Sequence, residues 1–171
     1  AEKTANSGIL KLTLWRAGTT QEVQLKLKVM GSYSDTAPYD CTKSKLILAD
    51  ACKVLEKEPL REGWTGAVNG LALLATGNPE YLPRLQEFAR KMGPQTLKLE
   101  LKDGMVVWDW GYRNIFLCEY YLVTGDKEVL HAINEYTITL AKGQSMYGTF
   151  GHGISMLTPD GKLHGSIPPY G

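Results

Sequence analysis

Two stretches of the chain decide its fold: LLATGNPEYL at residues 73–82 and YLVTGDKEVL at residues 121–130. They fall into register when the sequence is shifted by 48 residues, and apolar and aromatic positions match on both sides of them. Self-similarity at a fixed period of this length is typical of repeat architectures. We therefore predict that residues 43–142 are two tandem copies of one helical hairpin, the repeating unit of an α/α barrel or solenoid.

The shared TG[ND]xE turn predicts the shape of each copy. Gly77 and Gly125 stand where the end of a helix needs a left-handed residue. Asn78 and Asp126 follow directly and can cap the next helix, with an acid two residues later that suits the helix dipole. Each copy is thus expected to be an inner helix, a capped turn and an outer helix. One hairpin cannot bury both of its faces, so the copies must stack.

The N-terminal part has a different period. Apolar residues alternate with polar ones on both sides of Gly18, within residues 8–29. A period of two predicts a β-hairpin. A turn-rich linker follows, in which Thr42 is a candidate N-cap for a helix that Pro59 should end.

Two shorter hairpins are predicted around the helices. LKLELKDGMVVWDW at residues 97–110 places Asp103-Gly104 between alternating apolar residues, a strong type I′ turn signal. SMLTPDGKLHG at residues 155–165 has the same pattern in weaker form. Such inserts would lie on one face of the repeat, where functional residues tend to gather.

The composition excludes several classes of function. The 171 residues include 19 basic and 18 acidic ones, a net charge of +1 that leaves no footprint for nucleic acid or an anionic membrane. No apolar run approaches the length of a membrane span, and AEKTANSG lacks the regions of a signal peptide. Three scattered cysteines form no disulfide framework, and Cys52 and Cys118 are expected to be reduced core residues.

Five pieces of the chain carry a resemblance to a known family: LTLWRAG, GSYSDTAPYDCTKS, LALLATGNPEYL, FLCEYYLVTGD and GTFGHG with GKLHGSIPPYG. Together they resemble large bacterial proteins of unknown function in which the end of a PDZ domain leads into an α/α toroid of the squalene-cyclase and protein-prenyltransferase type. The resemblance implies that residues 1–30 are the C-terminal part of a PDZ-like domain, residues 31–42 a linker and residues 43–171 a partial toroid. It also implies association with the remainder of a larger chain.

The first candidate site contains two of the three histidines. Gly151 and Gly153 flank His152, which lets the backbone approach a ligand closely, and His164 follows in the next glycine-containing loop. These histidines are candidates for ligand binding or proton transfer. Their spacing of twelve matches no specific metal motif, so the metal and any cofactor stay open, and the alternative is a loop whose histidines only form hydrogen bonds.

Asp109 is the second candidate, because Trp108 and Trp110 flank it just before an expected inner helix. A carboxylate between large aromatic residues can have a raised pKa and act as an acid or base. Aromatic walls with a carboxylate also build many sugar sites. The alternative is that Asp109 is the N-cap of a helix that starts near Gly111.

Glu119 is the third candidate, because it interrupts the apolar run IFLCEYYLV. An acid on or beside a buried face needs a partner such as Arg113, or it faces a central cavity as glycosidase acids do. A bound ligand is expected to contact residues at the start of the same helix: Trp108, Trp110, Tyr112, Arg113 and Asn114.

Two functions follow from these readings. In the first, an enzyme-like toroid segment acts on or binds carbohydrate or a related polymer, with Asp109 or Glu119 as the acid or base and His152 and His164 as ligand or proton-transfer groups. In the second, the chain is a non-catalytic, PDZ-linked scaffold that binds protein or peptide segments in an exported bacterial protein. An enzyme requires the acids and His152 to converge in one aromatic-lined pocket, whereas a scaffold requires an exposed apolar edge.

Overall fold

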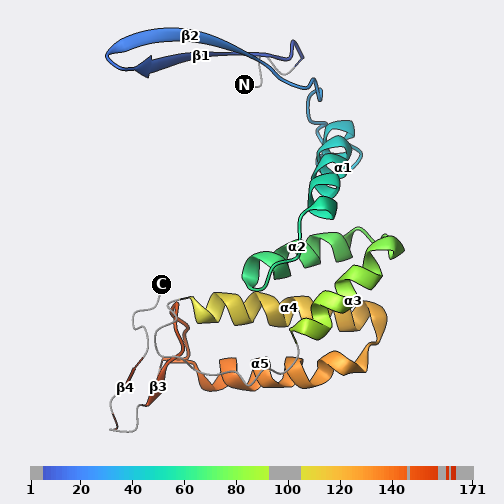
Figure 1. Cartoon of the computed structure of the whole chain (residues 1–171), viewed down its shortest axis with the longest axis vertical. Helices are drawn as coiled ribbons and strands as arrows, with labels where there is room; N and C mark the ends of the chain where they lie inside the picture. The colour runs from blue at the N-terminus through green and yellow to red at the C-terminus, as the bar shows by residue number, and fades with distance from the viewer. Residues whose placement is uncertain (1–5, 93–104, 146, 158–160, 162, 165–171) are drawn as a thin grey trace. The chain divides into compact units, whose positions relative to one another are not determined.

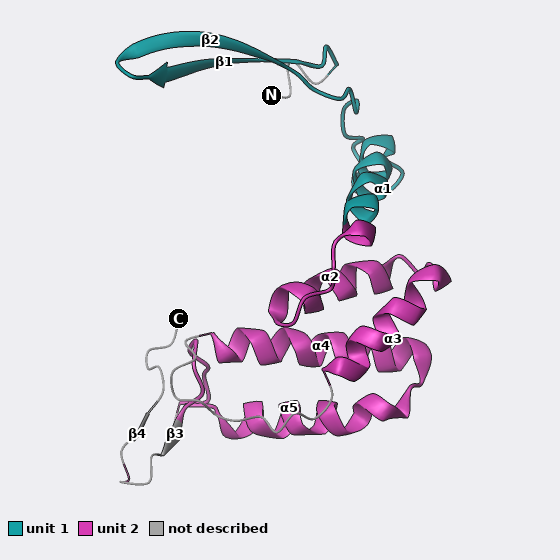
Figure 2. Cartoon of the chain, in the orientation of Figure 1, with its two compact units in different colours: residues 1–54 teal, residues 55–171 magenta. Residues whose placement is uncertain are grey.

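The computed structural model describes residues 6–92, 105–145, 147–157, 161 and 163–164. The chain divides into two compact units, residues 1–54 and residues 55–171 (Figure 2). Within the described part, the fold is mainly helical and has a two-stranded antiparallel hairpin near its N-terminus, as predicted.

The N-terminal hairpin consists of β1 (Ile9–Arg16) and β2 (Thr19–Lys26). Leu10 pairs with Leu25 and Leu12 with Val23, so the alternating apolar residues share one face of the ribbon. This confirms the prediction from the period of two. The strands have no buried residue, so the hairpin has no hydrophobic core of its own.

Helix α1 (Thr42–Lys57) follows the linker and ends just before Pro59, as predicted. Thr42 is the first residue of the helix, so the prediction that it is the N-cap is wrong; the carbonyl of Cys41 accepts the first hydrogen bond, from Lys45 N, over 3.1 Å. No residue of α1 is buried, so Cys52 is not a core residue. The buried cysteine is Cys41, which is 1% exposed.

The helical unit contains two helix–turn–helix hairpins. The first is α2 (Trp64–Ala75), the 3₁₀ helix η2 (Pro79–Tyr81) and α3 (Leu82–Lys91). The second is α4 (Val106–Thr124), the 3₁₀ helix η3 (Lys127–Val129) and α5 (Leu130–Lys142). Helix α4 lies between α2 and α5, and α2 runs in the same direction as α4 (Figure 1).

The two turns are built alike, as the repeated motif predicts. Gly77 and Gly125 both have a φ of +67°, in the left-handed region. The side chain of Asn78 accepts from Glu80 N over 3.0 Å, and that of Asp126 accepts from Glu128 N over 3.1 Å. These contacts satisfy N–H groups that a helix start would otherwise leave without partners.

The core of the helical unit lies where α4 meets its neighbours. Leu73, Leu85, Phe116 and Leu117 are fully buried, and the rings of Phe88 and Phe116 pack with centroids 5.3 Å apart. Each such side chain contributes roughly 1.5–3 kcal/mol by leaving water. Packing of the two hairpins against each other therefore stabilises the unit.

One predicted hairpin is confirmed and the other is wrong. β3 (Met156–Leu157) and β4 (Leu163–His164) pair antiparallel, as expected for residues 155–165. The hairpin predicted over residues 97–110 fails in its second half, because α4 begins at Val106. Its first half, residues 97–104, lies outside the described residues.

Arg84 on α3 binds the end of α1. Its guanidinium donates to the carbonyl oxygen of Leu55 over 3.2 Å, to that of Glu56 over 2.8 Å, and to that of Glu58. The last carbonyls of a helix have no partner within the helix, and a cation is favourable there. Arg84 therefore fixes the segment that enters the helical unit.

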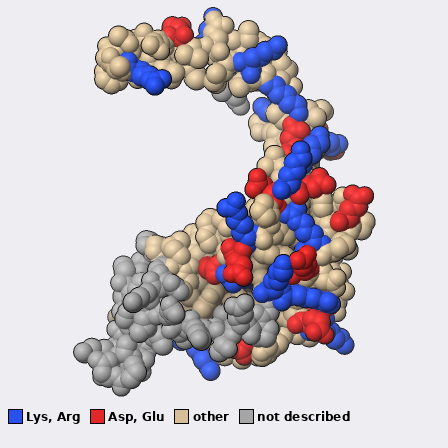
Figure 3. All heavy atoms as spheres, viewed as in Figure 1, with Lys and Arg blue, Asp and Glu red and all other residues tan. Residues whose placement is uncertain are grey.

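On the face that Figure 3 shows, the charged side chains of the described residues form no patch of a single sign. Figure 3 shows basic and acidic side chains intermingled over the visible face. None of the helices in the described ranges is long and apolar enough to cross a membrane.

Candidate functional site

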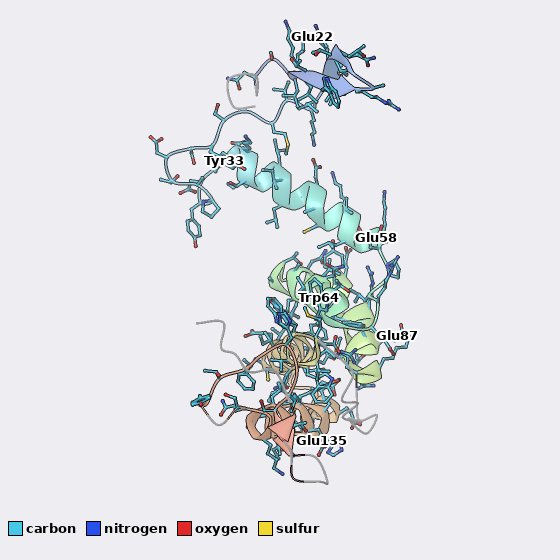
Figure 4. The ribbon with its side chains drawn as sticks, turned by 90° about the vertical axis from the view of Figure 1, so that its left-hand side faces the viewer. Glu22, Tyr33, Glu58, Trp64, Glu87 and Glu135 are labelled. Atoms are coloured by element: carbon cyan, nitrogen blue, oxygen red, sulfur yellow. The ribbon has the colours of Figure 1, made fainter. Side chains whose placement is uncertain are left out.

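The starts of α2 and α4 bring together three aromatic side chains, which we call the aromatic cluster: Trp64, Trp108 and Tyr112. The ring centroids of Trp64 and Tyr112 are 6.4 Å apart, and those of Trp108 and Tyr112 are 6.2 Å apart. Trp64 is 43% exposed and projects from α2 (Figure 4), and Trp108 is 46% exposed. Large indole rings are thus open to a ligand at one end of the unit.

Asp109 lies beside this cluster, in the first turn of α4 rather than before the helix. The alternative that it is the N-cap of a helix starting near Gly111 is therefore wrong, because α4 begins at Val106. Its Oδ2 accepts from Arg113 Nη2 over 2.9 Å, and its Oδ1 lies 3.3 Å from where a Cβ on Gly63 would stand. The carboxylate therefore lies near the starts of two helices, where the helix dipoles favour a negative charge.

The two tryptophans that flank Asp109 in the sequence do not enclose it. Positions two apart on a helix point about 200° away from each other. Trp108 is exposed, whereas Trp110 is 8% exposed and packs against Tyr136 of α5, with centroids 6.2 Å apart. The predicted carboxylate between two aromatic walls is therefore a carboxylate with one aromatic neighbour on the open side.

Arg113 links Asp109 to α5. Burial acts to lower the pKa of Arg113, but hydrogen bonding to Tyr136 and the charge of Asp109 outweigh it and hold that pKa above its usual range. Asn114 Nδ2 donates to Thr137 Oγ1 over 2.9 Å. In the described part of the chain, Arg113 Nε and Asn114 Oδ1 are buried side-chain atoms without a hydrogen-bond partner. Each of these two atoms can form a further hydrogen bond, Arg113 Nε as a donor and Asn114 Oδ1 as an acceptor.

His152 lies at the same end of α4. Its carbonyl oxygen accepts from Val107 N over 3.1 Å, which satisfies one of the free N–H groups of the first turn. The loop returns to α5 through Ser155 N, which donates to Gly143 O over 2.9 Å. The structure thus brings the backbone of His152 to the helix end that carries Asp109. His164 lies in β4, and the roles proposed for both histidine side chains stay predictions.

Glu119 does not join the site. It is exposed, so it is not a buried acid, and its expected partner Arg113 is bound to Asp109 instead. Glu119 lies ten residues after Asp109 on one helix, about 15 Å along the axis. The two carboxyl groups of a glycosidase are about 5–9.5 Å apart, so this pair does not fit either glycosidase geometry.

The described residues supply no metal centre. No group of three or more His, Cys, Asp or Glu side chains in the described ranges is placed to hold a metal ion. Cys118 is partly buried and reduced, and burial, with the nearby charge of Glu119, raises the pKa of its thiol. It is therefore a poor thiolate ligand.

A groove lies at the opposite end of α4. Its volume is about 510 Å³, and it is lined by residues of both turns, of α3 and of the end of α4: Pro79, Leu82, Pro83, Gln86, Arg90, Tyr120, Thr124 and Asp126. Sequence reasoning missed it. Its polar members come from three separate elements, and only the register of the two turns offered a signal that they meet.

These features define a mainly helical protein built from helical hairpins, with an aromatic and charged surface at one end. The family model described as "Domain of unknown function (DUF6288)" matches residues 44–171. The chain belongs to this family. No curated protein and no solved structure matches the chain.

Proposed function

We propose that this protein binds carbohydrate at the aromatic cluster and does not cleave it. One observation carries the proposal: Trp64 and Trp108 are each about half exposed and each pack against Tyr112, and the Asp109–Arg113 pair lies at the same helix start. The C–H face of a sugar ring packs on an aromatic ring, and its hydroxyls hydrogen-bond to carboxylate and guanidinium groups.

The pairing and spacing of the two carboxylates support binding without cleavage. The charge of Asp109 is paired with Arg113, and Glu119 is about 15 Å away along the helix. A sugar on the cluster would therefore meet one acid rather than two on opposite sides of its glycosidic bond. His152, in the adjacent loop, is the further residue that we expect to contact the ligand.

The experiment is a glycan array, followed by titration calorimetry with the oligosaccharide that binds. Trp64→Ala and Trp108→Ala should each weaken binding about tenfold, the effect of losing one ring contact of about 1.4 kcal/mol. Trp15→Ala is the matched control, because Trp15 is a 76% exposed tryptophan of β1, outside the cluster. Equal losses in all three variants, or no binding on the array, would refute the proposal.

The catalytic alternative is tested on the same samples. Asp109→Asn should retain most of the binding, and the wild-type protein should leave the bound oligosaccharide intact on long incubation. Hydrolysis by the wild-type protein that Asp109→Asn abolishes would instead show that Asp109 is a catalytic acid or base.

The larger architecture is also proposed. The two hairpins are the opening segment of an α/α toroid, and β1 and β2 are the last strands of a PDZ-like domain. The shared turns support the first statement. The second is supported by a hairpin whose Leu14, Leu25 and Leu27 are each more than 40% exposed, which suits strands that belong to a larger sheet.

The exposed leucines also favour a second candidate function, a PDZ-linked scaffold that binds peptides. A peptide-library screen would test it. Leu25→Lys should abolish capture of any peptide that adds to the sheet, whereas Trp108→Ala should not.

A further inference from the structure

Helix α3 presents a line of three chemically different side chains to the groove at the end of α4. Leu82, Gln86 and Arg90 all line this groove. They follow one another at intervals of four residues, so they lie on one face of the helix, about 6 Å apart along its axis. The groove thus offers an apolar group, an amide and a cation in this order, over a length of about 12 Å.

The end of the groove near the first turn is apolar. Pro79 and Pro83 line it together with Leu82. Both prolines are exposed, and a proline has no N–H to donate, so these residues form an apolar surface that is open to a ligand. This end suits an apolar side chain better than a sugar, whose hydroxyls would lose hydrogen bonds to water there.

The other end carries a cation whose position is fixed. Arg90 Nε donates to Asp126 Oδ2 over 3.2 Å, and the side chain of Asp126 is only 10% exposed. This ion pair uses Nε alone, so the two terminal nitrogens of the guanidinium lie outside it, on a side chain that is 51% exposed. Such a planar fork binds a carboxylate with two parallel hydrogen bonds.

The charges at this end suit a single negative charge on the ligand. Oδ1 of Asp126 accepts from Glu128 N, and Oδ2 accepts from both Arg90 and the Tyr120 hydroxyl. The carboxylate of Asp126 is therefore fully used within the protein. A phosphate group, with a charge of about −2, would meet one cation with a carboxylate directly behind it. A carboxylate carries half that charge, and its two oxygens match the fork of Arg90.

The helical repeat does not require this arginine. The shift of 48 residues places Ile138 of α5 at the position of Arg90, and Asn78 at that of Asp126. The equivalent outer helix and the equivalent turn thus form without these two charges. The arginine is therefore a feature of this groove rather than of the hairpin fold.

We propose that the groove binds the C-terminal end of a peptide chain, with the terminal carboxylate on Arg90. An extended chain rises about 3.4 Å per residue, so three to four residues span the line from Arg90 to Leu82. A backbone amide of the peptide pairs with the side chain of Gln86, and an apolar side chain packs on Leu82 and the two prolines. A short organic acid would reach the guanidinium but leave the apolar end empty.

The site is complete within the two hairpins of this chain. All the residues that line the groove come from α3, from the end of α4 and from the two turns, so no further hairpin is needed to build it. The proposal is also independent of sugar binding, because the aromatic cluster lies at the other end of α4.

The test uses the full chain and a library of tetrapeptides that are labelled with fluorescein at the N-terminus and have a free C-terminus. Fluorescence polarisation should identify peptides that bind. Amidation of the C-terminus should weaken the binding of each at least about tenfold, because the hydrogen bonds to a charged carboxylate are lost. Isovalerate, an apolar acid without a peptide chain, should compete poorly. Isovalerate that binds as tightly as the best tetrapeptide would overturn the assignment to a peptide.

Gln86→Glu closes the site with little effect on the fold. Gln86 is exposed and lies one turn before Arg90, so a glutamate there pairs with the guanidinium and repels a carboxylate. Gln86→Glu and Arg90→Gln should each weaken binding at least about tenfold. Lys91→Gln is the matched control, because it removes a cation from the same turn of α3 that pairs with Glu87 and lies outside the groove.

Two more variants separate this site from the other proposed ones. Trp108→Ala alters the aromatic cluster and Leu25→Lys alters the β1–β2 hairpin, and both should bind the tetrapeptides like the wild type. Four outcomes would each overturn the proposal: no tetrapeptide binding at about 1 mM, equal binding of the amidated peptides, undiminished binding by Gln86→Glu, or an equal loss in Lys91→Gln.

Discussion

The phenolic hydroxyl of Tyr120 donates to Asp126 Oδ2 over 3.0 Å. The same oxygen accepts from Arg90 Nε over 3.2 Å, while Oδ1 caps Glu128 N. One carboxylate thus joins the inner helix α4, the outer helix α3 of the preceding hairpin and the start of the next 3₁₀ helix. At the equivalent turn, Asn78 makes the cap with a neutral amide. The second turn therefore combines the shared cap with a charge that holds two hairpins together.

The stability of the helical unit should fall in acid through Asp126. Burial acts to raise the pKa of this carboxyl, but the Glu128 N–H, Arg90 and Tyr120 outweigh it and hold the pKa below 3.8. A lowered folded-state pKa stabilises the fold above the unfolded value of 3.8, and this contribution is lost as the pH falls through the folded value. Asp126→Asn keeps the cap but removes the charge, so its melting temperature should lie below that of the wild type at neutral pH. This difference in melting temperature, measured by circular dichroism, should shrink below pH 3.8. A difference in melting temperature that is the same at every pH would contradict the stabilising role of the Asp126 charge.

Alanine in the two turns should destabilise the unit, while alanine inside α4 should not. Gly77→Ala and Gly125→Ala force an alanine to a φ of +67° and should each cost about 1–2 kcal/mol. Gly111→Ala is the matched control, because Gly111 lies within α4 and a Cβ there meets nothing within 4 Å. It should gain about 0.5–1 kcal/mol from helix propensity. Urea denaturation measures all three; a loss in the control equal to the others would remove the argument from φ.

Gly70→Ala should also destabilise the unit, but for lack of space. The new Cβ would stand 2.8 Å from the Phe116 ring, and such overpacking costs about 1–3 kcal/mol. The cost should shrink when Phe116→Leu provides room, and a double-mutant cycle measures the coupling between the two sites. Additive effects of the two substitutions would show that the ring does not limit position 70.

Asp109 and Arg113 should prove energetically coupled. Their side chains are 23% and 21% exposed, so removing one partner leaves a half-buried charge. Asp109→Asn and Arg113→Met should each cost about 1–2 kcal/mol, between the values for exposed and buried pairs. The double variant should cost less than the sum of the two. Chemical denaturation at low and high salt is the measurement, and a strictly additive result would mean that the ion pair contributes no stability.

Local patterns predicted the local structure well. The TG[ND]xE turns, the β1–β2 hairpin and the β3–β4 hairpin depend on glycine φ values, short caps and strand alternation, all set by neighbouring residues. Because the same turn residues recur 48 residues later, they predict the same turn structure at both places. The caps at Asn78 and Asp126 could therefore be named from the sequence alone.

The prediction of a β-hairpin over residues 97–110 failed because tertiary packing, rather than local strand preference, decides which of these residues are buried. Val106, Trp108 and Trp110 alternate with other residues as in a strand, and β-branched and aromatic residues favour strands. In the structure Val106 and Trp110 are buried while Trp108 is exposed, which is the spacing of four that a helix buries on one face. The local strand preference is overridden because α4 gains a core contact at each end of this turn.

Glu119 shows the other limit of sequence reasoning. Its apolar neighbours suggested a buried face, but Ile115 and Leu122 beside it are themselves exposed. An apolar stripe predicts that a face can be covered, and the coverage itself depends on which element packs there. For the same reason the sequence could not show that Arg113 pairs with Asp109 rather than with Glu119.

The hold of Arg84 on the end of α1 has a mechanical consequence. A pulling force on the N-terminal hairpin reaches the helical unit at Leu55, its first residue. There the Arg84 guanidinium donates hydrogen bonds to the carbonyl oxygens of Leu55, Glu56 and Glu58. In a protein held by its N-terminal hairpin, these hydrogen bonds would have to break before residues 55–58 could separate from α3.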